Sequence, residues 1–131
     1  MNNKTIKNKY LLSIVELGGY PDFSHIYKQY QLEVEITNSM RKAVKLLKKN
    51  TPDIIVAEFN YQSDFRDRTS NLETLLAVLQ KKPQVKLIIF YEKEFAHQFE
   101  RVTRRFDLPF TLPFPIDEQA LSEMVQRCLN D

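Results

Sequence analysis

The feature that most constrains the fold is a short apolar run, residues 54–57, that ends at a carboxylate, Glu58. Isoleucine and valine dominate the run and no polar residue interrupts it, which is typical of a strand buried on both faces. An amphipathic helical pattern over residues 40–49 precedes it, and a Pro52-Asp53 pair separates the two. A helix that feeds a fully buried strand is typical of a parallel sheet with helical crossovers.

The rest of the chain repeats this alternation of strand and helix five times. Strands are predicted at residues 10–15, 32–37, 54–57 and 85–90 and near Phe110, and helices at residues 22–31, 40–49, 72–80, 93–106 and 117–130. In the second strand, Leu32, Val34 and Ile36 alternate with polar residues, and prolines bracket the fifth, so both resemble edge strands. The predicted fold is therefore α/β: a flavodoxin-like, doubly wound, five-stranded parallel sheet of order 2-1-3-4-5 with helices on both faces.

Composition limits the class of protein. A chain of 131 residues that is 43% hydrophobic fits one domain, residues 1–131, with a basic tail over residues 1–8. The single cysteine excludes an intrachain disulfide and a multi-cysteine metal site. No stretch approaches the roughly 20 apolar residues of a membrane span, and no signal peptide is evident, so we expect a cytoplasmic protein without membrane contact or cofactor.

Three segments, in this order, carry a resemblance to a known family: Ala43-Val44-Lys45-Leu46-Leu47, the strand from Pro52 to Glu58, and Leu112-Pro113-Phe114. Over about residues 9–129 the chain resembles a response-regulator receiver domain of the CheY-like kind. The resemblance implies a role in signal transduction of the two-component or phosphorelay type. It also implies a cis bond between Leu112 and Pro113.

Receivers act through five positions at the carboxyl ends of their strands. Two acidic residues and an acceptor aspartate hold Mg²⁺, and a serine or threonine hydroxyl and a lysine contact the phosphoryl group. The corresponding positions here are Glu16, Leu17, Glu58, Tyr91 and Leu112, of which Glu16 alone keeps the family's character. The resemblance therefore implies a degenerate pseudo-receiver, which is not an enzyme and is not phosphorylated by the usual aspartyl route.

Two interpretations of Glu58 remain open. It could mimic a phosphorylated aspartate, although with one charge where phosphate adds about 1.5–2, or it could be a strand-end carboxylate that caps a backbone amide. Glu16 and Glu58 together form a weak candidate for a cation site, and no other metal site is predicted.

The segment of residues 61–71 is longer than the family's usual connection and follows the strand that ends at Glu58. It is either a disordered excursion or a recognition loop, because loops at this edge of α/β proteins carry function. Its candidate partner contacts are Tyr61, Phe65, Arg66 and Arg68.

The preferred function is protein–protein interaction, through this loop or through the fourth helix and fifth strand, where homodimerisation is also possible.

One alternative is a small nucleotide- or cation-dependent enzyme, but Gly18-Gly19 are the chain's only glycines and make no phosphate-binding fingerprint. Another is a nucleic-acid adaptor that uses the basic faces of two helices, which we expect on opposite sides of the domain: Arg41, Lys45, Lys48 and Lys49 on one, and His97, Arg101, Arg104 and Arg105 on the other. The net charge of +2 gives nucleic-acid binding little support.

Overall fold

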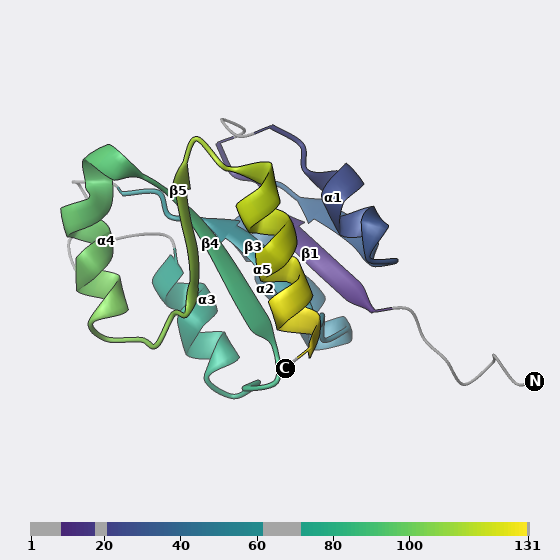
Figure 1. Cartoon of the computed structure of the whole chain (residues 1–131). Coiled ribbons are helices and arrows are strands. Elements are labelled where there is room, and N and C mark those ends of the chain that lie inside the picture. Colours follow the sequence, from purple (N-terminus) through teal and green to yellow (C-terminus); the bar gives the residue numbers. More distant parts are fainter. Residues whose placement is uncertain (1–8, 18–20, 62–71, 131) are drawn as a thin grey trace, which may run out of the picture.

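The computed structural model describes residues 9–17, 21–61 and 72–130, which form a parallel sheet with helices on both faces (Figure 1). The strands are β1 (Tyr10–Ile14), β2 (Glu33–Thr37), β3 (Ile54–Glu58), β4 (Lys86–Glu92) and β5 (Phe110–Phe114). The helices are α1 (Ser24–Gln29), α2 (Met40–Lys49), α3 (Leu72–Leu79), α4 (Ala96–Thr103), which follows the 3₁₀ turn η2 (Lys93–Phe95), and α5 (Glu118–Asn130). The order β2-β1-β3-β4-β5 confirms the predicted fold.

Two hydrophobic cores lie on the two faces of the sheet. Helices α1 and α5 cover one core, in which Ile54 and Val56 of β3 are buried, and helices α2, α3 and α4 cover the other, in which Ile55 and Ala57 are buried. Alternate residues of a strand point to opposite faces, so residues 54–57 of β3 are all apolar because both faces of the strand are covered. Contrary to expectation, the basic helices α2 and α4 therefore cover the same face, and α3 lies between them (Figure 1).

Helix α2 shows how local sequence sets an element. Ser39 is its N-cap, and the Ser39 hydroxyl accepts the backbone N–H of Lys42 at 3.1 Å. A cap of this kind stabilises a helix by about 1 kcal/mol. Ala43 and Leu47 are buried one turn apart on the inner face, while the predicted basic face is exposed.

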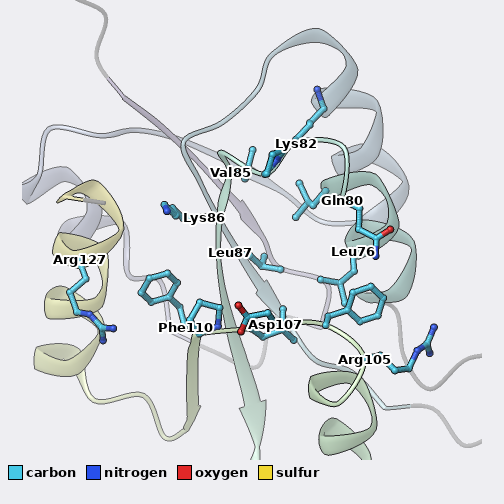
Figure 2. Close-up of a pocket in the computed structure, with 15 residues that line it drawn as sticks. Leu76, Gln80, Lys82, Val85, Lys86, Leu87, Arg105, Asp107, Phe110 and Arg127 are labelled. Carbon is cyan, nitrogen blue, oxygen red and sulfur yellow. The ribbon is translucent and has the colours of Figure 1, made fainter.

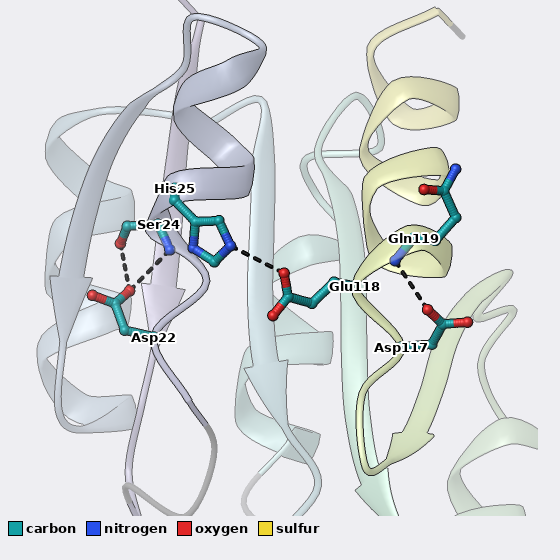
Figure 3. Close-up of polar contacts among 6 residues, drawn as sticks. All are labelled: Asp22, Ser24, His25, Asp117, Glu118 and Gln119. Carbon is teal, nitrogen blue, oxygen red and sulfur yellow. Dashed lines mark hydrogen bonds and ion pairs between the residues drawn. The ribbon is translucent and has the colours of Figure 1, made fainter.

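Helices α1 and α5 begin in similar ways and are joined at that point (Figure 3). Asp22 accepts the backbone N–H of Ser24 at 2.9 Å, and Asp117 accepts the backbone N–H of Gln119 at 3.0 Å. His25 of α1 lies 3.1 Å from Glu118 of α5. These turns place the first residues of both helices side by side on the same face of the sheet.

Edge strand β2 differs from the predicted pattern. Leu32 is buried and Val34 is half-buried, but Ile36 is 55% exposed. Helix α1 begins at Ser24, two residues later than predicted, and has only six residues. So short a helix covers the first half of the β2 segment and leaves Ile36 open.

The prediction of a cis bond at Leu112–Pro113 was wrong, because the cis bond joins Phe114 and Pro115. Strand β5 continues two residues past Leu112 and includes Pro113, which an edge strand tolerates because its missing N–H is not needed by a second neighbour. Among the described residues, no helix is long and apolar enough to cross a membrane.

Matched isoleucines in β3 and β2 test the two-faced core. Ile55 is fully buried, so Ile55→Ala should lower the free energy of unfolding by about 2–5 kcal/mol through lost contacts and the cavity that remains. Ile36→Ala should change it by no more than about 0.5 kcal/mol, because Ile36 is exposed. Urea denaturation of both variants measures the difference, and equal losses would contradict the described burial.

Candidate functional site

The carboxyl ends of β1 and β3 bring two acidic residues together. Glu58 is the last residue of β3 and is only 3% exposed, while Glu16 follows β1 and is half-buried. The parallel register pairs Ser13 of β1 with Val56 of β3, so the carboxyl ends of both strands lie at the same end of the sheet. Ligand sites of open α/β sheets lie at this edge.

Backbone and side-chain amides hold the Glu58 carboxylate. Its Oε1 accepts the backbone N–H of Leu17 at 3.3 Å, and the backbone N–H of Glu16 also donates to the carboxylate. The Asn60 side-chain amide donates at 3.4 Å. These are the contacts expected of a strand-end carboxylate that caps backbone amides.

Asn60 connects the two carboxylates. Its Nδ2 lies 3.4 Å from Oε1 of Glu58 and also 3.4 Å from Oε1 of Glu16, so one amide group donates to both. The sequence analysis missed this residue, although its place two residues after the strand-end carboxylate is a usable signal. Within the described residues no group of three His, Cys, Asp or Glu side chains could hold a metal ion, so the candidate cation site has two carboxylates only.

Burial raises the pKa of Glu58, because the charged form loses its hydration. The hydrogen bonds from Leu17, Asn60 and Glu16 lower this pKa in part, and the nearby charge of Glu16 adds to the rise. The folded protein therefore holds the Glu58 proton more tightly than the unfolded chain does.

The side chains of the other three predicted site residues do not join this pair. Leu17 contributes its backbone N–H, while its side chain is exposed. The Tyr91 ring lies 4.7 Å from the ring of Phe99, so it packs against α4. Leu112 is buried in the core beneath α1 and α5.

Two criteria locate the position of the family's lysine on β5, and they disagree. By the register of the strands, the position is Leu112, because Glu58 pairs with Phe90 of β4 and Phe90 pairs with Leu112 of β5. By the carboxyl end of the strand, the position is Phe114, the last residue of β5. Both residues are apolar, so neither criterion brings a cation from β5 toward Glu58.

Five aromatic side chains join the ends of β3 and β4 to helix α4, and we call them the aromatic cluster: Phe59, Tyr61, Tyr91, Phe95 and Phe99. Phe99 lies 4.9 Å from Phe59 and 4.7 Å from Tyr91 between ring centroids, and Tyr61 lies 5.7 Å from Phe95. Tyr61 is thereby anchored at the start of the predicted partner loop. The other candidate contacts of that loop, Phe65, Arg66 and Arg68, lie outside the described residues.

Solved structures decide the fold family. The chain has the fold of response-regulator receiver domains. It is similar to a receiver-domain protein from Clostridium thermocellum, with 15% sequence identity, 95% of each chain covered and a TM-score of 0.71. It is also similar to the chemotaxis protein CheY4 of Vibrio cholerae, with 17% identity, 93% and 99% of the two chains covered and a TM-score of 0.70.

NtrX from Brucella abortus is similar over 95% of this chain but only 27% of its own, with 13% identity and a TM-score of 0.73. No protein-family model and no curated protein sequence matches the chain. The likeness to receiver domains is therefore one of fold.

The raised pKa of Glu58 predicts how stability depends on pH. Because the folded state binds this proton more tightly, the stabilising effect of the protonated form is lost as pH rises through the folded pKa, which lies above 4.5. Glu58→Gln removes this loss, so its free energy of unfolding should rise relative to that of the unmodified protein between pH 4.5 and pH 7. Urea denaturation across this range measures the difference.

Glu94→Gln, at an exposed position on η2, controls for the change in net charge. A relative stability of Glu58→Gln that falls as pH rises would show that the hydrogen bonds to the carboxylate outweigh its burial.

Proposed function

We propose that this protein is a pseudo-receiver, a non-enzymatic signalling module that acts by binding another protein and is not phosphorylated by the usual aspartyl route. The observation that carries the proposal is the state of Glu58 at the place of the acceptor. It is a glutamate, it is buried, and amide groups of Leu17 and Asn60 occupy one of its oxygens.

Phosphoryl transfer requires positive charge around the acceptor, because the transition state carries negative charge on several oxygens. Leu17 supplies no carboxylate to help hold a cation, and the Asn60 amide lies between the two carboxylates that remain. Both candidate lysine positions on β5, Leu112 and Phe114, are apolar. These differences from the receiver family support a signalling module that binds its partner without being phosphorylated.

The aromatic cluster supports a constant partner surface. In the receiver family Ser or Thr stands at the position of Tyr91, and its hydroxyl contacts the phosphoryl group. The Tyr91 ring instead packs on Phe99 of α4. Helix α4 is therefore held in place by ring packing, and we propose that α4 and β5 present one fixed surface to a cytoplasmic protein partner or to a second copy of this chain.

An NMR titration with Mg²⁺ and then beryllofluoride tests the loss of phosphorylation. We expect no saturable shift of the amides of Glu16, Glu58 and Tyr91, because the site lacks the second carboxylate and the lysine. Leu17→Asp combined with Glu58→Asp is the matched variant, since it restores three carboxylates and should give Mg²⁺-dependent shifts. Localised, saturable shifts in the unmodified protein would overturn the proposal.

Hydrogen exchange tests the fixed surface. Tyr91→Ala removes the ring that packs on Phe99, so amide exchange in α4 should accelerate several-fold, in line with about 0.5–1.5 kcal/mol for an aromatic pair. His97→Ala, at an exposed position on the same helix, should leave exchange unchanged. Unaltered protection of α4 in Tyr91→Ala would mean that the cluster does not hold the helix.

A further inference from the structure

A cavity of about 560 Å³ lies at the amino ends of β4 and β5, at the opposite end of the sheet from Glu58 (Figure 2). Its origin is the register of these two strands. The first residue of β5, Phe110, pairs with Ile88, so Lys86 and Leu87 of β4 extend beyond the start of β5. The connection from α4 to β5 passes around this uncovered edge and leaves the hollow.

The walls of the cavity combine apolar and polar surface in similar proportion. They come from α3, the connection between α3 and β4, β4, the connection between α4 and β5, the start of β5, and Arg127 of α5 (Figure 2). The apolar lining residues are Leu76, Leu79, Leu87, Phe106, Leu108 and Phe110. This apolar part of the surface favours a ligand with an apolar body.

The charges around the cavity are mostly positive. Lys82, Lys86, Arg105 and Arg127 line it, and Asp107 is the single acidic residue that does so. Arg105 is neutralised by Glu73 at 2.7 Å. Lys86 and Arg127 form no ion pair with any residue in the described ranges, and the Arg127 guanidinium lies 5.3 Å from the centre of the Phe110 ring.

The backbone N–H of Leu87 also lies on the cavity side of β4. Lys86 donates its N–H to Asp53 on the β3 side, so the alternation of a parallel ladder directs the N–H of Leu87 toward β5. The ladder with β5 begins only at Phe110, so this N–H lies where β5 has not yet begun to pair with β4. This N–H therefore lies on the side of β4 that carries the cavity, in a position to donate to an acceptor group of a ligand.

We propose that this cavity binds a small organic anion, with its carboxylate, sulfonate or phosphate group at Lys86 and Arg127 and its apolar body against the walls. The charge imbalance selects an anion, and the aromatic and aliphatic lining selects a body of the same character. The volume lies within the range of about 300–1,000 Å³ that is typical of small-molecule sites. The proposal does not rest on the proposed function, because none of the residues that line the cavity belongs to the site at Glu16, Glu58 and Asn60.

The test uses 1-anilinonaphthalene-8-sulfonate, an aromatic sulfonate, as the probe, with fluorescence titration of the whole chain. We expect saturable binding of one probe molecule per chain. Lys86→Gln combined with Arg127→Gln should weaken binding by at least about tenfold, which is about 1.4 kcal/mol, because the variant removes both positive charges that face the sulfonate. The uncharged analogue N-phenyl-1-naphthylamine should bind more weakly than the sulfonate.

The matched control is Lys45→Gln combined with Arg101→Gln, which removes the same charges from exposed positions outside the cavity. Its affinity should be unchanged. In amide NMR spectra, the probe should shift Leu87, Leu108 and Phe110 and leave Glu58 unaffected, and thermal unfolding should confirm that both variants fold.

Three results would each overturn the proposal. They are an absence of saturable binding, an equal loss of affinity in the cavity variant and the control, and amide shifts centred on another surface. Dimerisation of the free chain that buries Lys86 and Arg127, measured by light scattering, would also overturn it and would assign the cavity to a second copy.

Discussion

Burial of β3 on both faces is the constraint on which the rest of the structure depends. All five of its residues are buried, so helices must cover both sides of the sheet and β1 and β4 must flank the strand. The same burial encloses its last residue, Glu58, and a buried carboxylate is stable only where hydrogen bonds replace its hydration. The Leu17 N–H and the Asn60 amide supply those bonds, so the central strand and the candidate site form one structural unit.

The satisfied state of Glu58 bears on the chemistry of this edge. In a receiver, the acceptor carboxylate must be free to attack phosphorus and must lie beside positive charge. Here donors already engage one of its oxygens, burial raises its pKa, and Asn60 joins it to Glu16. A carboxylate in that setting stabilises the ends of β1 and β3. Under the proposed function, its structural role and its low suitability as a phosphoryl acceptor have the same cause.

Hydrophobic pattern was sufficient to predict the strand order, because two-sided apolar runs and proline-bracketed or alternating strands separate interior from edge positions. It was insufficient where the length of an element decides the outcome. Ile36 is exposed because α1 is short, and Leu112 lies inside β5 because the strand continues to Phe114. The amide bridge of Asn60 depends on the distance between two strand ends, and the cavity depends on where β5 begins to pair with β4. Neither property is encoded by periodicity.

The carboxyl end of the sheet carries the acidic pair Glu16 and Glu58, and the amino end carries the basic cavity. Strand β4 and helix α4 reach both ends. Strand β4 runs from Lys86 in the cavity to Tyr91 in the aromatic cluster. Helix α4 is held near its start by Phe95 and Phe99, and the segment after it, with Arg105 and Phe106, lines the cavity. An anion bound at Lys86 would therefore lie near the carboxyl end of α4, which the aromatic cluster does not contact. If α4 and β5 form the partner surface, a ligand in the cavity would lie against the segment that joins these two elements.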